Sequence, residues 1–243
     1  MSGLGLTFLR RGNLAHPTAG SNYILSATRG DQEVYSVLMA KGVSSDGVGI
    51  TKEDLESKVT ENIVNTFKGN TKIVSFDELN YCKKVTSLTD TFADCTNLAK
   101  VGLVNIITYS RRLNNGAFYN TSIEEMIMPN LETIGTWGSR GMPMLRRVFI
   151  GKKCTSMNPG WAFYQCPLLS TLVILAVTPP PIGNGDMSGT ALASGNGRIY
   201  VPADSVDAYK AASGWSTWKN SIVPISQLKT DNPAFYNNIE QYL

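Results

Sequence analysis

The sequence has very little of the residues that most often bind metals or carry enzyme chemistry. It contains one histidine, His16, and four cysteines among 243 residues. Zinc sites usually need cysteine or histidine ligands in pairs about two to four residues apart, and Cys82, Cys95, Cys154 and Cys166 form no such pair. Nucleophilic catalysis needs a base beside the nucleophile, and His16 is far in sequence from every cysteine. We therefore expect no metal, no cofactor and no catalytic residues, and predict that the protein is not an enzyme.

Long apolar runs and clustered charge are missing as well. No apolar run approaches the roughly 20 residues that a membrane-spanning helix needs. A secretory signal places its positive charge before its apolar stretch, whereas Arg10 and Arg11 follow the short apolar stretch here. The net charge is only +3, and the basic residues are scattered, while nucleic-acid-binding proteins concentrate them on one face. We expect no membrane insertion, no nucleic acid and no export by the usual route.

The cysteines are also too few to form a disulfide framework in a chain of this size. Cys95 and Cys166 each precede an apolar hexamer by three residues, so they occupy equivalent places in the sequence. Such positions favour small buried thiols over disulfides.

What the sequence does contain is one hexamer that returns with a nearly constant period. Its pattern is apolar-x-x-apolar-x-apolar, and successive copies are 22, 25, 22 and 24 residues apart. The copies start at Phe76, Leu98, Ile123, Leu145 and Leu169. A strand that alternates apolar and polar residues, repeated every 20–29 residues or so, is typical of leucine-rich repeats. Because one such unit cannot bury its apolar face alone, neighbouring units are expected to stack, with their strands forming a parallel sheet.

The segments between the hexamers repeat too, and they carry a family resemblance. "FADCTNL", "IMPNLETIG", "WAFYQCPLL" and the closing "IYVPADSVDAYKAASGWSTWKNSIVPI" resemble the BspA-like class of leucine-rich repeats. The resemblance implies a β-rich α/β solenoid with a parallel β-sheet, a short helical and Gly-rich N-terminal segment and a C-terminal helical cap. The repeat from 98 to 123, with "VNIITYSRRLNNGAF", is longer and less regular than the others.

Three regions follow from this organisation. Residues 1–70 form a Gly-rich attachment segment with two short helices, around Glu33 to Lys41 and Lys52 to Val59. Residues 71–201 form the solenoid, and residues 202–243 form the cap and tail. Between the last full repeat and the cap, "TPPPIGNGDMSGTALASGNG" is rich in Pro, Gly and Ser, which predicts a surface loop.

Two surfaces are candidate sites. The fifth hexamer positions should face away from the core, yet Ile127, Phe149 and Val173 are apolar. Either they are buried under the Pro-rich loop, or, with Arg147, they form a binding surface. The second surface is for attachment, and its candidate residues lie in the Gly-rich N-terminus: Leu4, Leu6, Phe8, Arg10 and Arg11.

The N-terminal sequence suggests a function. "AHPTAGSNYI" and "KGVSSDGVGITKEDL" resemble leading segments of repeat proteins from phages and prophages of gut Bacteroidales. The resemblance implies a non-catalytic structural or binding protein of the virion, of fibre or decoration type, assembled in the host cytoplasm. Its expected partners are other virion proteins, further copies of itself as a homo-oligomer, and a host-surface protein or glycan. The alternative is a BspA-like adhesin or interaction protein on the bacterial surface.

Overall fold

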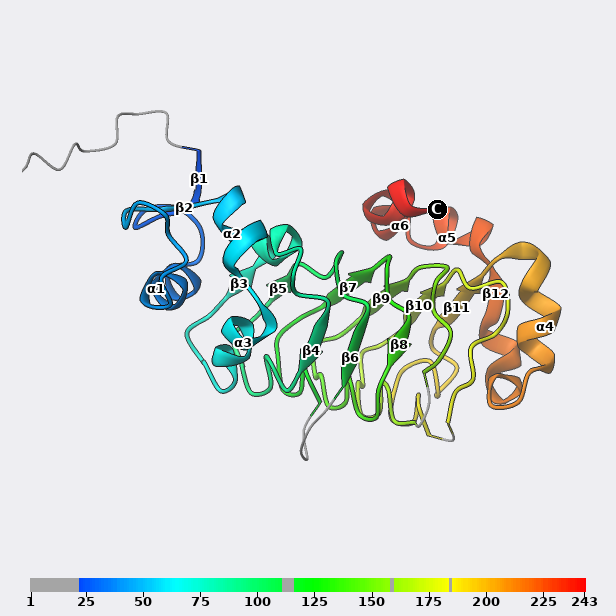
Figure 1. The fold of residues 1–243 in the computed structure, drawn as a ribbon. Helices are drawn as coiled ribbons and strands as arrows, with labels where there is room; N and C mark the ends of the chain where they lie inside the picture. Colours follow the sequence, from blue (N-terminus) through cyan, green and yellow to red (C-terminus); the bar gives the residue numbers. More distant parts are fainter. Residues whose placement is uncertain (1–21, 111–115, 158–159, 184) are drawn as a thin grey trace, which may run out of the picture.

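The computed structural model describes residues 22–110, 116–157, 160–183 and 185–243. It shows a row of short parallel strands, with a helical N-terminal segment at one end and C-terminal helices at the other (Figure 1). The predicted attachment residues Leu4, Leu6, Phe8, Arg10 and Arg11 lie outside the described residues.

Five parallel strands form one side of this row, which we call the front sheet. Its order is β12-β11-β10-β9-β7. The strands are β7 (Glu125–Met128), β9 (Arg147–Ile150), β10 (Thr171–Ile174), β11 (Arg198–Val201) and β12 (Ile222–Pro224). Residues from equivalent hexamer positions pair across the strands, as Val148 does with Met126 and Leu172, and these three side chains are buried. Alternation along each strand therefore places one column of apolar residues in the core.

The other strands belong to the same repeats. β4 (Ser87–Thr89), β6 (Thr108–Ser110) and β8 (Thr133–Ile134) form a three-stranded parallel sheet, and β3 (Ser75–Phe76) pairs with β5 (Lys100–Val101). The first hexamer positions fill the interior between the strands, because all four predicted core residues are completely buried: Leu98, Ile123, Leu145 and Leu169. Their predicted burial is confirmed.

The register of the first repeat differs from the prediction. Phe76 pairs with Val101, the fourth position of the next hexamer, and Ser75 pairs with Lys100. The first hexamer thus starts at Ile73, which is completely buried, and the residues after Phe76 form the 3-10 helix η2 (Asp77–Tyr81). The prediction was wrong by three residues because Phe76, Leu79 and Tyr81 show the same spacing as a true hexamer. The first two intervals are therefore both 25 residues.

The described residues of the Pro-rich stretch contain no helix or strand and many are exposed, as predicted for a surface loop, but the stretch also forms part of another repeat. Met187 and Leu192 are buried in the core. The backbone N–H of Phe163 donates to the Asp186 carbonyl at 2.9 Å, and that of Gln165 donates to the Ser188 carbonyl at 3.0 Å. Its glycines and prolines thus accommodate a turn that still hydrogen-bonds to the preceding repeat.

The chain then closes with helices that pack on the last repeats. The predicted helix is present as η3 (Ala203–Ser205) and α4 (Val206–Ala211), followed by η4 (Trp215–Ser221). The Tyr209 hydroxyl donates to the Ala176 carbonyl, and the Trp215 indole N–H donates to the Pro180 carbonyl, both at 2.8 Å. Both rings are completely buried. β12 follows η4 and extends the sheet beyond residue 201, where the sequence predicted only a cap and tail.

The N-terminal segment lies against the first repeat (Figure 1). It contains the two predicted helices, α1 (Gln32–Ala40) and α2 (Lys52–Lys58). Its other elements are β1 (Tyr23–Leu25), β2 (Ile50–Thr51), α3 (Glu61–Val64) and η1 (Asn65–Phe67), and β1 and β2 pair antiparallel.

Two carboxylates join this segment to the free edges of the strands. One oxygen of Asp31 accepts the N–H groups that start α1, and the other accepts those of Val74 and Ser75 at 2.8 and 3.0 Å. One oxygen of Glu61 accepts the N–H groups of Thr86 and Ser87 at 3.3 and 3.2 Å.

The same arrangement recurs between later repeats, with a backbone carbonyl as the acceptor. The N–H groups of Arg146 and Arg147 both donate to the Glu124 carbonyl, at 2.9 and 3.1 Å. Asp31 and Glu61 therefore each supply an oxygen at the place where a preceding repeat would supply its carbonyl.

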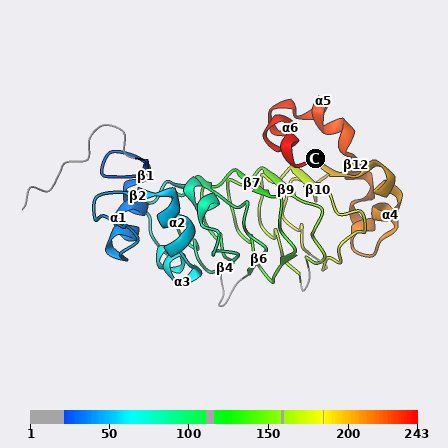
Figure 2. The ribbon, with the colours of Figure 1, turned by 45° about the horizontal axis from the view of Figure 1, so that its top comes forward.

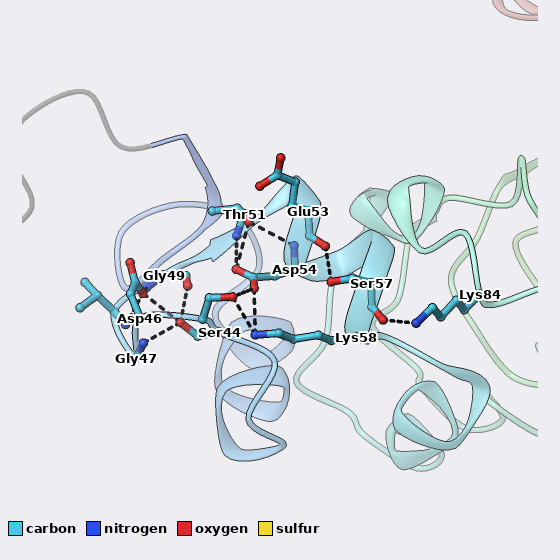
Figure 3. A network of polar contacts seen from close by, with 12 residues as sticks. Ser44, Asp46, Gly47, Gly49, Thr51, Glu53, Asp54, Ser57, Lys58 and Lys84 are labelled. Carbon is cyan, nitrogen blue, oxygen red and sulfur yellow. Dashed lines mark hydrogen bonds and ion pairs between the residues drawn. The ribbon is translucent and has the colours of Figure 1, made fainter.

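A buried carboxylate holds the N-terminal segment together internally (Figure 3). Asp54 accepts the backbone N–H and the hydroxyl of Thr51, both at 3.0 Å, and the hydroxyl of Ser45, and it forms an ion pair with Lys58 at 3.1 Å. Thr51 in turn caps α2 by accepting the N–H of Asp54 at 3.1 Å. Burial alone would raise the pKa of the Asp54 carboxyl, but the bonds from Ser45, Thr51 and Lys58 lower it to about 2.

Acid is expected to weaken this segment. The folded-state pKa of Asp54 is lowered from 3.8 to about 2, so its stabilising contribution is present above pH 3.8 and is lost as the pH falls through about 2. Hydrogen exchange of the α2 amides across this range should show the loss. In the Asp54→Asn protein, the α2 amides should exchange faster near neutral pH, and their protection should depend less on pH between 3.8 and about 2. Equal pH profiles for the two proteins would contradict a stabilising role for ionised Asp54.

Candidate interaction surface

The outer face of the front sheet carries an apolar column. Ile127, Phe149 and Val173 stand side by side in neighbouring strands, and the column continues to Tyr200 and Val223. Phe149 and Val173 are completely buried, and Ile127 is half-buried. These residues belong to a second apolar cluster, separate from the main core.

The chain's own C-terminus covers this column. We call residues 225–243 the arm, and it comprises η5 (Ile225–Gln227), α5 (Leu228–Asp231), α6 (Pro233–Ile239) and η6 (Glu240–Tyr242). The arm folds back over the front sheet (Figure 1, Figure 2). Leu228, Phe235 and Ile239 are buried in the same cluster as Phe149 and Val173. Both predicted alternatives are therefore wrong for Phe149 and Val173. These residues are buried under the arm, and neither lies under the Pro-rich loop nor forms an open contact patch.

Polar contacts fix the arm at its rim. The Tyr200 hydroxyl donates to Asp231 at 2.9 Å, and the Asn238 amide donates to Glu125 at 3.0 Å. Burial, followed by the hydrogen bond to Asp231, raises the pKa of Tyr200. The predicted binding residue Arg147 forms an ion pair with Glu125 at 2.8 Å, and its guanidinium lies 6.0 Å from the Phe235 ring.

The strands break at the repeat that looked irregular in the sequence. In the described part of the chain no strand pairing joins β5 to β7, although β6 and β8 of the same repeats do pair. A hollow of ≈ 610 Å³ lies here, between the two strands and the end of the arm. Its lining includes Asp77, Asn80, Lys100, Glu125, Ile127 and Tyr242.

A second hollow continues the first towards the N-terminal segment. It shares Asp77, Asn80, Gln241 and Tyr242 with the first and adds residues such as Arg29 and Glu78. We call the two hollows together the trough.

Charges of both signs line the trough, together with amides and apolar groups. Glu124 and Glu125 form ion pairs with Arg146 and Arg147 of the next repeat. Burial raises the pKa of the Glu78 carboxyl, and the negative charge of nearby Asp77 adds to this effect. A lining that combines charged, amide and apolar side chains resembles the composition of protein interfaces.

The period, the parallel strands and the buried hexamer positions agree with a known repeat family. Residues 62–179 match the BspA type leucine-rich repeat region, in six copies. A comparison with curated protein sequences gives no match. Within the described ranges, no helix is long and apolar enough to cross a membrane, and no group of three or more His, Cys, Asp or Glu residues could hold a metal ion.

The turns of the leucine-rich repeats carry an aromatic cluster that was not predicted from the sequence. The rings of Trp137 and Trp161 stack with centroids 5.7 Å apart, Tyr164 meets Trp161 edge-on at 4.6 Å, and the Arg140 guanidinium lies 4.1 Å from Trp137. All four side chains are half-buried. The recurrence of tryptophan after 24 residues was the signal available in the sequence.

Both tryptophans have an uncommon backbone conformation. Their φ angles are +62° and +68°, in the left-handed region, where the equivalent position of the next repeat has Gly185. Bulky residues in this region cost on the order of 1–3 kcal/mol each. The ring contacts offset part of this cost, since aromatic pairs contribute about 0.5–1.5 kcal/mol each beyond burial.

The four thiols lie inside the leucine-rich repeats or next to them. All are buried and free. The thiols of Cys95 and Cys166 each donate to a carbonyl of a preceding segment, Phe67 and Ser139 respectively, at 2.9 Å. Burial raises the pKa of Cys95 to about 11 and that of Cys166 to about 12.

These thiols are expected to resist alkylation in the folded protein. The reactive form is the thiolate, and burial disfavours it at all four positions. Mass spectrometry after iodoacetamide treatment near neutral pH should show no adduct on the native protein and four adducts after denaturation. Rapid modification of the native chain would contradict this prediction.

Proposed function

We propose that the protein is a non-catalytic binding protein that presents the trough to a protein or a glycan. Leucine-rich repeats suggest a role in binding. One observation supports the trough as the binding site. The arm covers the column at Phe149 and Val173 but leaves hollows open at the break between β5 and β7. Aromatic, amide and charged side chains meet there, as they do in interfaces.

The proposal includes a solenoid closed at both ends. The N-terminal segment would close the first repeat, because Asp31 and Glu61 occupy the carbonyl positions of a missing neighbour. Tyr209 and Trp215 would close the last repeats, through their bonds to the carbonyls of Ala176 and Pro180. Terminal repeats need such closure to remain soluble.

Binding of the labelled protein to a glycan array and to intact bacterial cells tests the proposed surface. Lys100→Glu and Tyr242→Ala alter the trough, and we expect each to reduce binding at least about tenfold, as interface aromatic and charged residues do. Val177→Ala is the control, because Val177 is 70% exposed and does not line the trough. Equal binding by all three variants would show that the trough is not the site.

A finer proposal is that the chain is a virion component attached through its N-terminus, and this rests on the resemblance of its leading segment to phage repeat proteins. The alternative is a bacterial surface adhesin. Deleting Met1 to Gly20 should abolish incorporation into particles and leave thermal unfolding nearly unchanged. Normal assembly of the truncated chain would contradict N-terminal attachment, and immunolabelling of bacterial surfaces instead of particles would favour the adhesin.

A further inference from the structure

We propose that the outer face of β9, β10 and β11 is a helix-binding site, and that the arm of a second copy can occupy it in place of the chain's own arm. The resident arm shows what the site accepts, because it fills the site in the structure. The arm also lines part of the trough through Tyr242, but the proposal does not depend on what the trough binds.

The arm is separable from the rest of the core. The main core contains no buried residue from 225–243, whereas the second cluster is built from the arm and the outer column. The arm follows β12 directly at Ile225 and contains helices but no strand. Releasing it would therefore break no strand pairing and leave the main core intact.

The arm carries a recognition pattern of its own. Phe235, Ile239 and Tyr242 follow the spacing i, i+4 and i+7, which is how an amphipathic helix places anchors in a groove. Phe235 and Ile239 are buried in the second cluster, and the Tyr242 ring lies 5.9 Å from that of Phe149. The helix also carries its own start, because Asn232 accepts the N–H of Phe235 at 3.1 Å and Pro233 is the first helical residue.

The contacts between the front sheet and the arm would be the same whichever copy supplied the arm. Tyr200 and Glu125 belong to the sheet, and their partners Asp231 and Asn238 belong to the arm. These two bonds fix the direction of the helix, and the apolar anchors Phe235 and Ile239 are buried against the sheet. When the arm leaves, the exposed Phe149 and Val173 need a helix with these anchors, and every other copy carries one. Exchange of an identical element between copies is a known route to dimers.

A complementation experiment on the full chain tests this. Phe235→Ser with Ile239→Ser disables the arm and leaves the face unchanged, and Phe149→Asp disables the face and leaves the arm unchanged. Native mass spectrometry should show that each variant alone is monomeric and that the mixture forms a heterodimer. The control mixes the first variant with a chain carrying all three substitutions, which offers no intact arm, and we expect no dimer from it.

A labelled peptide of residues 225–243 provides a second measurement. Fluorescence anisotropy should show it binding the arm-disabled chain at least about tenfold more tightly than wild type, whose face is occupied. A peptide with Phe235→Ser and Ile239→Ser should not bind. Absence of both heterodimer and peptide binding, with the arm-disabled chain folded, would overturn the proposal.

Hydrogen exchange of the wild type decides the remaining case, in which the arm-disabled chain does not fold. The arm amides should then exchange by a local opening, faster than those of β9 and β10. If the arm exchanged only together with these strands, it would be an integral part of the fold, and the proposal would be wrong.

Discussion

Replacing Leu145 by alanine is expected to lower the free energy of unfolding by about 2–5 kcal/mol, as truncations of buried leucine do. Leu145 is completely buried in the column of first hexamer positions, between Ile123 and Leu169 of the adjacent repeats. The substitution leaves a cavity that the hydrogen-bonded strands on either side cannot close. Chemical denaturation followed by circular dichroism measures the change.

The matched control is Val177→Ala. Val177 is 70% exposed, so its truncation should change the free energy of unfolding by no more than about 0.5 kcal/mol. A Leu145→Ala protein as stable as this control would mean that the first hexamer positions do not form the core.

Asp31→Ala is expected to lower the free energy of unfolding by about 3 kcal/mol. The carboxylate accepts four backbone N–H groups, two at the start of α1 and two at the edge of the first repeat. Hydrogen bonds to charged groups contribute about 1.5–3 kcal/mol, and the loss of a helix cap costs about 1 kcal/mol. Glu61→Ala should have a smaller effect, because its two backbone bonds are longer, at 3.3 and 3.2 Å.

Two further variants separate these causes. Asp31→Asn keeps one acceptor oxygen, which can accept from α1 or from the edge of the first repeat but not from both. Its free energy of unfolding should therefore lie between those of the wild type and Asp31→Ala. Asp204→Ala removes an exposed carboxylate from the C-terminal region and should change the free energy of unfolding little. Equal stability of Asp31→Ala and Asp204→Ala would contradict a role for Asp31 at the edge.

The repeat and most of its core could be predicted from the sequence, because burial imposes a pattern within each unit. Leu98, Ile123, Leu145 and Leu169 follow from spacing alone. The register of the first repeat could not be predicted from the sequence, because Ile73 and Phe76 both begin an apolar-x-x-apolar pattern. Only the pairing with Lys100 and Val101 decides between them.

Contacts between distant segments could not be predicted. Asp31 meets Val74 across 43 residues, and Asn238 meets Glu125 across 113. The apolar column could be predicted, but its cover could not, because the spacing of Phe235, Ile239 and Tyr242 does not say which surface these residues contact. β12 was missed because three residues ending in proline carry no strand period of their own.

The stacked pair of Trp137 and Trp161 has an optical consequence. Their ring centroids are 5.7 Å apart, close enough for the electronic transitions of the two indoles to couple. Coupled transitions whose dipoles are skewed relative to each other produce a pair of circular dichroism bands of opposite sign that neither ring has alone. Because the rings belong to successive repeats, those bands report the contact between these two repeats without any attached label. Total fluorescence, by contrast, also includes Trp215 and Trp218.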